Sequence, residues 1–559
     1  MRLRRRRIAR KKSLRTRAAV LELPCAFAGK ISRLSGIQPW SDASFSPAAG
    51  CNTSRDLPRG ELERLNLIDL ELIESQPMTQ RAPDSAFESV RVSEVLAALS
   101  FALDLTEGQT LGHSLRTCLI GMRISERLGL SVGDRRDLYY ALMLKDAGCS
   151  SHAAQVFALL GGGERVERGG TSRVDWVSYL KAARFGLAHV APGASWLERA
   201  RRIAAFARFG PRVANELVET RSSRGAEIVA RLGFGAGVAN AVRAVDERWD
   251  GSGQPKGLAG DQIPLLARIM CLAQALEVYT TMSGAGAALS AAIQRGGKWF
   301  DPALVAVAVE YEHELNRLRA LDGSALKSEV QDVEPGDAAL LAGPGALDRI
   351  ALGFAEVVDA KSPFTAEHSY RMSDLAIRIA QRLGYEAGAL ASLRRAALLH
   401  DIGKLSVPNS ILDKPAPLTA EEWEVVRLHP YYTQRILLHV RGFKQIAHIA
   451  AAHHERLDGR GYYRGLKAAQ VPLGSQILST ADQFDALTAE RPYRPALPEE
   501  TALRIMERDR DTGVSGACLD ALGTAIESWD GAIKRRDDVI EPAAPAAIAE
   551  SGEEQRQAA

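Results

Sequence analysis

Cysteine is scarce in this chain of 559 residues, and no two cysteines stand close together. The six cysteines occur singly, at positions 25, 51, 118, 149, 271 and 518, and no Cys-x-x-Cys pair is present. This spacing argues against a disulfide framework and against a zinc site built from thiolates. It fits a reducing compartment, so we expect a cytoplasmic protein.

Long apolar runs are missing as well. No run approaches the ~20 residues that a membrane-spanning helix needs, so we expect no transmembrane segment. The basic start of the chain lacks the apolar stretch of a secretory signal. With 46% hydrophobic and 25% charged residues, the composition is that of an ordinary globular protein. The length suggests about three domains.

Acidic residues are absent from the first 20 positions, which carry ten Arg or Lys. The net charge of +3 is therefore misleading, because the remainder of the chain is mildly acidic. Charge gives no support for nucleic-acid binding by the folded body, and we expect no DNA partner. No helix-turn-helix signature follows residue 530, and no Gly-rich phosphate loop follows a strand.

The two ends of the chain show no sustained apolar periodicity. We expect residues 1–85 to be basic, low in complexity and disordered, and residues 531–559 to form a flexible tail. Three interpretations of the basic arm stay open. It can contact RNA or anionic lipid, it can be a solvated tail, or translation can begin near Met78.

Histidine is rare but concentrated, since seven of the eleven histidines follow residue 367. Imidazole and carboxylate side chains gather within 83 residues, namely His400, Asp401, His429, His453, His454 and Asp482. These are the ligand types of a two-metal hydrolytic site. The alternative, unrelated histidines at helix ends, requires several of them to cluster by chance.

This ligand set suits attack on a phosphodiester, an anion that resists water. Two divalent metals about 4 Å apart can hold a bridging hydroxide and neutralise the phosphoryl oxygens. Asp401 has two oxygens with which to bridge such metals. Lys404, one loop step further, is placed to meet a phosphate oxygen.

Apolar residues recur at helical spacing through the body of the chain, and no convincing alternation of period two appears. We therefore predict an all-α protein made of two helical bundles. In the second bundle Thr419 and Glu422 predict a capping box that opens a helix carrying His429. The other helices expected there span residues 347–360, 368–383, 389–400, 445–455, which ends on the His453-His454 pair, and 473–488.

The body contains two similar halves. Residues 112–116, 144–148 and 246–253 match residues 367–371, 399–403 and 454–461, respectively. The offset between matching positions is 255 residues at first and 208 later, so the first half carries about 47 extra residues near 161–208. A shared scaffold is the simplest explanation.

The first half has lost most of the candidate ligands. Lys145, Arg221, Val245, Asp246 and Gln274 stand where the second half has His400, His429, His453, His454 and Asp482. Only His113 and Asp146 survive, and the two new cations would repel a metal. We expect no metal pair there. The first half can be a scaffold, an anion sensor that uses Lys145 and Arg221, or a homodimer interface.

Residues 345–530 resemble the HD-GYP branch of the HD metal-dependent phosphohydrolases. The motifs that carry this resemblance are Thr365-Ala366-Glu367-His368-Ser369, His400-Asp401-Ile402-Gly403-Lys404, His429-Pro430, His453-His454-Glu455, Asp458-Gly459, Gly461-Tyr462, Asp482, Asp485-Ala486-Leu487-Thr488 and Arg491-Pro492-Tyr493-Arg494. The resemblance implies a helical catalytic domain with two iron or manganese ions. It also implies hydrolysis of cyclic di-GMP to pGpG or GMP. Residues 88–315 look like a degenerate HD domain, with a linker at 316–344.

The resemblance also implies roles for single residues. Those expected to bind metal are His400, Asp401, His429, His453, His454 and Asp482, with Asp401 and Lys404 catalytic. The residues that match substrate contacts in the family are Lys404, Gly461, Tyr462, Arg491 and Arg494, with Asp458 and Asp485 as supports. Some members bind a third metal through a Glu that is Phe364 here. We therefore expect two metals, with His368 as a ligand or a supporting residue.

One departure concerns the family's Gly-Tyr-Pro, which is Gly461-Tyr462-Tyr463 here. Proline would fix the loop, whereas tyrosine leaves it freer and bulkier. The metal ligands do not depend on this position, but substrate fit and contact with a GGDEF-type cyclase do. Two alternatives therefore stay open, a non-catalytic receptor for a cyclic dinucleotide and hydrolysis of another cyclic nucleotide.

Overall fold

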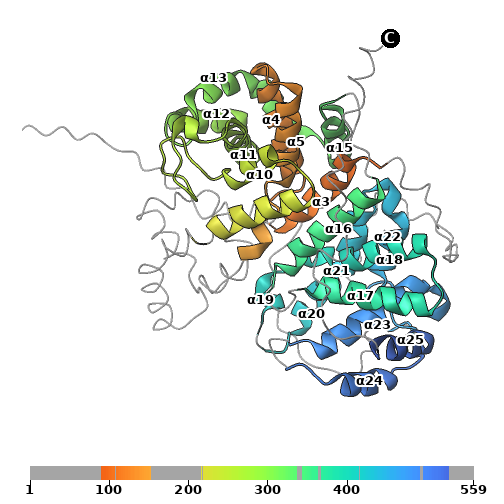
Figure 1. Ribbon diagram of the computed structural model, residues 1–559. Coiled ribbons are helices and arrows are strands. Elements are labelled where there is room, and N and C mark those ends of the chain that lie inside the picture. The colour runs from red at the N-terminus through yellow and green to blue at the C-terminus, as the bar shows by residue number, and fades with distance from the viewer. Residues whose placement is uncertain are drawn as a thin grey trace, which may run out of the picture. The chain divides into compact units, whose positions relative to one another are not determined.

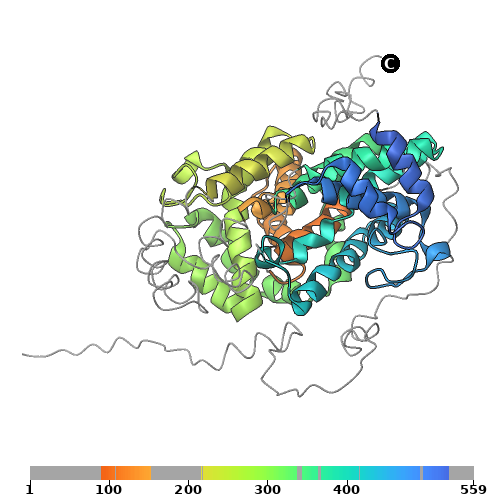
Figure 2. The same ribbon diagram turned by 90° about the horizontal axis from the view of Figure 1, so that it is seen from below.

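The computed structural model describes helices joined by turns and loops, which confirms the predicted all-α fold. Within the described residues, extended pairing is limited to isolated bridges such as that between Asp458 and Lys467. Figures 1 and 2 show these helices crossing one another in bundles. The described ranges are 90–106, 109–152, 216, 218–336, 343–362, 367–414, 416–490 and 495–527.

The first half contains the helices that precede residue 333. Besides the helical residues 218–231, they are α3 (Val92–Thr106), α4 (His113–Arg127), α5 (Val132–Leu144), α10 (Ala236–Arg243), α11 (Leu265–Ser283), α12 (Ala285–Arg295), α13 (Pro302–Ala308), α14 (Glu312–Ala320) and α15 (Gly323–Asp332). Within this set, α11 packs against α4 and α12, and α5 packs against α4 and α10.

The second half contains the candidate ligands. Its helices are α16 (Pro344–Asp359), α17 (His368–Arg382), α18 (Ala387–Leu399), α19 (Asn409–Leu412), α20 (Ala420–Arg427), α21 (His429–Leu437), α22 (Lys444–Ala451), α23 (Leu473–Thr488), α24 (Glu499–Glu507) and α25 (Gly516–Ile526). A 3-10 turn, η7 (Ile402–Ser406), follows Asp401.

Helix α17 is central to the second half because its apolar residues recur on one face. Met372, Leu375 and Ile379 are fully buried, and the helix packs against α18, α23 and α25. Such spacing places one stripe of a helix in the core. The same packing holds the two ends of the ligand set together, since α18 leads into His400 and α23 carries Asp482.

Two helix ends differ from the sequence prediction. The capping box of Thr419 and Glu422 is present, but its helix stops at Arg427, and His429 begins α21. Pro430 stands at the start of α21, where a missing amide is tolerated. Helix α22 stops at Ala451, so His453-His454 lies in the turn beyond it.

The segment 316–344, expected as a linker, contains the end of α14 and all of α15. Leu326 and Val330 of α15 are buried, and the carbonyl of Val330 accepts a hydrogen bond from Tyr139. The sequence hides this packing because α15 presents only two apolar residues at helical spacing to the core.

Contacts join the two halves near the candidate site, and both belong to one compact unit. Helix α3 packs against η7, the turn after Asp401. Arg231 pairs with Glu356 of α16, and Lys327 donates to the backbone carbonyl of His439. The first half therefore supports the backbone that leads out of the ligand set.

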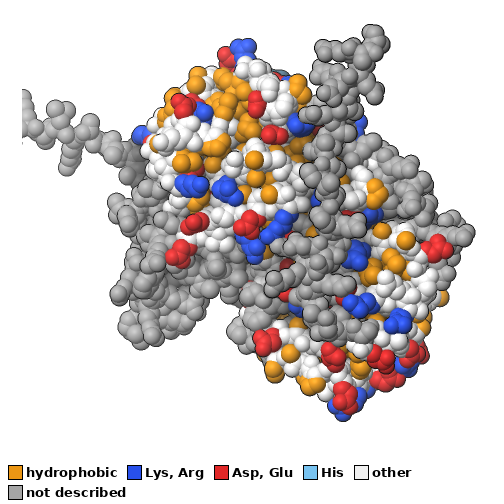
Figure 3. Space-filling view, in the orientation of Figure 1, with side chains coloured by type: hydrophobic (Ala, Val, Ile, Leu, Met, Phe, Trp, Pro, Cys, Tyr) orange, Lys and Arg blue, Asp and Glu red, His pale blue; other side chains and the backbone are white. Residues whose placement is uncertain are grey.

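The described surface carries charges of both signs. On the face drawn in Figure 3, Lys and Arg side chains are interspersed with Asp and Glu. Hydrophobic side chains also reach the surface, and Ile293 and Val132 are the most exposed of the large ones. Among the described residues, no helix is both long and apolar enough to cross a membrane.

A close backbone approach fixes η7 against α21 and generates the first prediction. A Cβ added at Gly403 would overlap the carbonyl oxygen of His429 and lie 2.7 Å from the amide nitrogen of Thr433. We expect Gly403→Ala to lower the free energy of unfolding by about 3 kcal/mol or more, because backbone atoms must move apart. Urea unfolding measures this change.

The matched control is Gly523→Ala in α25, where nothing lies within 4 Å of the added Cβ. Alanine favours a helix interior over glycine by about 1 kcal/mol, so this variant should be as stable as the parent or more so. Equal stability of the two variants would show that η7 can move away from α21 at little cost in free energy.

Candidate metal centre

Three of the candidate histidines lie just beyond the end of a helix. His400 follows α18, His429 follows α20, and His453 follows α22. In each, Nδ1 lies close to the carbonyl oxygen three residues earlier, at 2.6 Å for His400, 2.7 Å for His429 and 2.5 Å for His453. The last carbonyls of a helix lack amide partners, so imidazole satisfies them.

This arrangement fixes the chemistry of each ring. A carbonyl oxygen only accepts, so Nδ1 must carry a proton, and Nε2 has a lone pair whenever the ring is neutral. Because the ring is held from behind, Nε2 points away from the helix end. Such hydrogen bonds orient the histidine ligands of metals.

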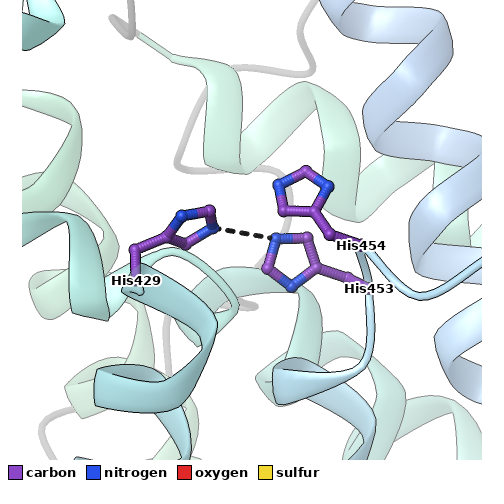
Figure 4. Close-up of side chains that lie close together, drawn as sticks. All are labelled: His429, His453 and His454. Carbon is purple, nitrogen blue, oxygen red and sulfur yellow. Dashed lines mark hydrogen bonds between the residues drawn. The ribbon is translucent and has the colours of Figure 1, made fainter. Parts of the chain in front are cut away.

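One group of ligand atoms is formed by His429, His453 and His454, which Figure 4 shows in close-up. The Nε2 atoms of His429 and His453 are 3.3 Å apart. The rings of His453 and His454 have centroids 4.0 Å apart. His429 and His453 are buried, whereas His454 is partly exposed.

A second group is formed by His368, His400 and Asp482. His368 Nε2 lies 3.3 Å from Asp482 Oδ1, while its Nδ1 lies 2.7 Å from Asp485 Oδ2. Asp485 also accepts from Arg371. The sequence analysis left two roles open for His368, a metal ligand or a supporting residue. In the structure its Nε2 lies among the candidate ligand atoms. Asp485 contacts the other nitrogen of that ring, and its supporting role in a metal site stays a prediction.

Asp401 lies between the two groups. Its Oδ1 is 3.2 Å from Nε2 of His429 and 3.8 Å from that of His453. Its Oδ2 is 3.2 Å from Nε2 of His400 and 3.7 Å from that of His368. The two oxygens of one carboxylate thus face different sets of imidazoles, which is the geometry that a bridging ligand needs.

Unsatisfied atoms test whether metal ions fit. His368 Nε2, His400 Nε2 and Asp401 Oδ1 are buried and have no hydrogen bond within the described structure. Burying such atoms without a partner costs roughly 1–3 kcal/mol each. All three point into the space shared by the two groups, so divalent cations would satisfy them together.

The pKa values of His453 and His454 are also suited to the binding of metal cations. Burial, together with the neighbouring imidazoles of His454 and His400, holds the pKa of His453 well below its usual range. Burial lowers the pKa of His454 to about 3. Both rings are therefore neutral, and neutral imidazole is the form that binds metal.

The carboxylates are ionised. Burial would raise the pKa of Asp401, but the charges of His400 and Lys404 hold it well below its usual range. Burial opposes a charge on His368 too, yet Asp482 and Asp485 raise its pKa to about 10. Asp482 and Asp485 therefore stabilise a positive charge on the ring between them even without a metal.

In the first half, lysine provides that positive charge. Lys145 Nζ contacts Asp146 Oδ2 and lies 3.1 Å from His113 Nε2. Lys145 and Asp146 are both buried. Burial lowers the pKa of Lys145, but attraction by Asp146 outweighs it, so the pKa is raised and the ammonium stays charged. The ammonium thus compensates the buried carboxylate in place of a metal.

Other contacts recur in both halves at the offsets of 255 and 208 residues seen in the sequence. The contact of Asp104 with Ser114 in the first half matches that of Asp359 with Ser369 in the second. The contact of His113 with Glu277 matches that of His368 with Asp485. Glu247 accepts from the amides of Lys256 and Leu258, just as Glu455 accepts from those of Arg464 and Leu466. The ligand positions differ while the supporting contacts match.

The loop after His454 is folded around a carboxylate that the sequence analysis did not single out. Buried Glu455 accepts hydrogen bonds from the amides of Arg464 and Leu466. A Cβ on Gly461 would lie 2.5 Å from Cα of Glu455, so this position requires glycine. The presence of glutamate at the matching positions 247 and 455 of the two halves was the sequence signal that could have identified this residue.

The loop places Tyr462 beside the candidate ligands. Its ring centroid is 4.5 Å from that of His454 and 6.3 Å from that of His429. Tyr463, where the family has proline, faces α21 instead. Its hydroxyl donates to Gln434 Oε1 at 2.6 Å, and its ring meets Tyr431 edge-on. Side-chain contacts therefore attach this loop to the helix that begins with His429.

The structure describes two more of the predicted site residues, Asp458 and Lys404. Asp458 accepts from Arg456 and from the backbone amide of Arg460, so it braces the loop. Lys404 contacts Asp401 Oδ2 directly. Phe364, Arg491 and Arg494 lie outside the described residues.

Comparison with known proteins assigns the family. A family model described as "HD domain" matches residues 213–304 and 354–515. A 3'3'-cGAMP-specific phosphodiesterase of Vibrio cholerae serotype O1 is 40% identical over 440 residues, which cover 78% of this chain and 94% of that protein. A cyclic di-GMP phosphodiesterase of Thermotoga maritima is 41% identical over 145 residues, covering 26% of this chain and 39% of that protein.

A solved structure agrees with the sequence relatives. The crystal structure of a cyclic GMP-AMP specific phosphodiesterase of V. cholerae is similar to this chain with a TM-score of 0.55 and 38% identity, covering 79% of this chain and 99% of that chain. A helical fold with clustered His and Asp side chains is typical of metal-dependent phosphohydrolases. This chain belongs to that HD superfamily and, within it, to the HD-GYP family.

Metal content tests the two ligand groups. Protein loaded with iron or manganese should hold about two ions per chain, because two groups share one bridging carboxylate. Asp401→Ala should hold less than about one, since both sites lose a ligand. Elemental analysis of the dialysed protein measures both values.

The control is Asp374→Ala, which removes an exposed carboxylate paired with Arg378 on α17. It should keep the metal content of the parent protein. A parent value near three ions per chain, or an unchanged value in Asp401→Ala, would contradict this assignment.

The lysine of the first half generates a stability prediction. Lys145→Met leaves Asp146 buried without a compensating charge, and the free energy of unfolding should fall by about 3–5 kcal/mol. The double variant Lys145→Met/Asp146→Asn removes both charges and should recover much of the loss. Metal-free protein is unfolded in denaturant to compare them. A stable single variant would show that Asp146 does not need the ammonium.

Proposed function

We propose that this chain is a phosphodiesterase that hydrolyses cyclic dinucleotides with the help of two divalent metal ions. The observation that carries the proposal is the position of Asp401, whose two oxygens face two separate sets of imidazoles. The relative of 440 matched residues supports the reaction class, because this chain covers 94% of a protein named as a cyclic dinucleotide phosphodiesterase.

The candidate ligands are proposed to form two cation sites. His368, His400 and Asp482 would hold one cation, His429, His453 and His454 would hold the other, and Asp401 would contribute to both sites. Two divalent ions held by these residues would supply activated water and would neutralise the phosphoryl oxygens. Water adds its oxygen to phosphorus, the P–O bond to the ribose breaks, and a proton released by that water passes to the leaving oxygen. Iron or manganese suits the mixed imidazole and carboxylate ligands.

Lys404 is proposed to contact substrate. Its ammonium contacts Asp401 Oδ2 and is partly exposed. Cations that bind Asp401 would replace the ammonium there and leave it beside the entering phosphate. Tyr462 packs against His454 with its ring tilted, and so lies beside the same ligands.

The substrate proposed first is 3'3'-cGAMP, in place of the cyclic di-GMP expected from the sequence. The 3'3'-cGAMP-specific relative matches 78% of this chain, and so includes both halves. The cyclic di-GMP phosphodiesterases of Thermotoga maritima and Xanthomonas campestris match 26% and 30% of it. Cyclic di-GMP stays the second candidate. Contact with a GGDEF-type cyclase and formation of a homodimer stay predictions.

The first half is proposed to be a metal-free scaffold. A sensor that binds anions through Lys145 and Arg221 would need both cations at the surface. Lys145 is buried against Asp146, and Arg221 pairs with Asp246 at 3.1 Å. The packing of α3 on η7 instead supports the turn that carries Lys404.

A direct assay tests the function. The full chain, reconstituted anaerobically with iron or manganese, is incubated separately with 3'3'-cGAMP and with cyclic di-GMP. We expect linear product from 3'3'-cGAMP at the higher kcat/KM. Asp401→Ala should reduce that value by about a thousandfold or more, because the residues of a catalytic unit act together. Asp374→Ala should retain the parent rate.

Faster hydrolysis of cyclic di-GMP would reverse the order of the two substrates. Binding of either nucleotide without turnover by the metal-loaded protein would favour a receptor. Turnover that survives Asp401→Ala would remove this site from the reaction.

A further inference from the structure

An arginine and a tryptophan lie on the outer side of the metal centre, and the sequence analysis assigned neither of them. Trp423 and Arg427 stand four residues apart on α20, and Arg427 is two residues before the candidate ligand His429. Residues spaced in this way share one face of a helix. Arg427 is exposed, and 42% of Trp423 is exposed.

Together with Tyr462, these side chains extend outward from the ligand groups. The ring of Tyr462 packs against His454 with centroids 4.5 Å apart. The guanidinium carbon of Arg427 lies 5.9 Å from the centroid of Tyr462 and 6.0 Å from that of Trp423. The order from the metal centre to solvent is therefore imidazole, phenol, guanidinium and indole.

Helix stability alone does not require this arrangement. An Arg–Trp pair four residues apart on an exposed helix face contributes about 0.5–1 kcal/mol at most. Arg427 forms no ion pair with a carboxylate in the described part of the chain, although Arg371, Arg395 and Arg510 each do. Its guanidinium edge is thus open to an anion at the rim of the site.

The chemistry of a cyclic dinucleotide matches this surface. The molecule has two phosphates and two purine bases, whereas the metal centre takes only the phosphate that is cleaved. A planar guanidinium is suited to the second phosphate, which it can bind through two parallel hydrogen bonds. An exposed indole offers a face on which a base stacks, whatever its identity.

We propose that Trp423 and Arg427 form a subsite for the nucleotide whose phosphate is not cleaved, an inference that rests on the proposed function. Arg427 binds the second phosphate, and Trp423 stacks on the adjoining base. Tyr462 joins this subsite to the metal centre. A substrate that lacks bases and a second phosphate gains nothing from it.

The test compares two substrates on the metal-loaded full chain. One is the cyclic dinucleotide that the parent hydrolyses fastest, and the other is bis(p-nitrophenyl) phosphate, a small phosphodiester without bases. In Trp423→Ala and in Arg427→Ala, the ratio of kcat/KM for the dinucleotide to that for the small substrate should fall about tenfold, mainly through KM. Trp423→Phe keeps a stacking face and should lose less.

Two further variants define the cause. Arg427→Lys keeps the charge but loses the planar fork, so it should lie between the parent and Arg427→Ala. Arg504→Ala, an exposed arginine on α24 that bonds to Thr501, should leave the ratio as in the parent. Metal content and melting temperature are measured for every variant, so that unfolding is separated from a change in binding.

Either of two results would overturn the subsite. The ratio can stay within twofold of the parent value, or both substrates can lose activity equally. Parent protein that cleaves only the small substrate would instead contradict the proposed function, and the subsite with it.

Discussion

The second half of this protein depends on keeping one buried carboxylate, that of Asp401, ionised. A buried charge is tolerated only where other charges or hydrogen bonds compensate it. The compensating groups come from separate elements, His400 from the end of α18, His429 from the start of α21, and Lys404 from η7. The crossing of these helices is therefore also an electrostatic requirement.

Helix ends explain why imidazole is suited to this task. The last carbonyls of α18, α20 and α22 would be unsatisfied, and a histidine one or two residues further on satisfies one of them with Nδ1. The same hydrogen bond directs Nε2 toward Asp401. One local feature thus completes a helix and orients a ligand. The close approach of Gly403 to the backbone of α21 then sets the spacing between two such ends.

Spacing and residue type in the sequence were sufficient for the helical fold and for the grouping of His400, Asp401, His429, His453, His454 and Asp482. Helix ends were less predictable. His429 was expected in the helix that Thr419 opens, but that helix ends at Arg427 and His429 begins the next one. His453 was expected at the end of a helix but lies two residues beyond it. The hydrogen bond between Tyr463 and Gln434 joins elements that are distant in the sequence, so only the folded chain reveals it.

The ammonium of Lys145 means that the two halves differ in how their stability depends on the supply of metal ions. A cation that is part of the chain cannot be chelated, exchanged or oxidised, whereas a bound metal ion can. With metal bound as proposed, the stability of the second half would rise with the logarithm of the free metal concentration, and that of the first half would not. We expect the first half to keep its fold when metal is scarce, with α3 still packed against η7. The enzyme would then lose activity without unfolding as a whole, and resupply of metal would restore it without new synthesis.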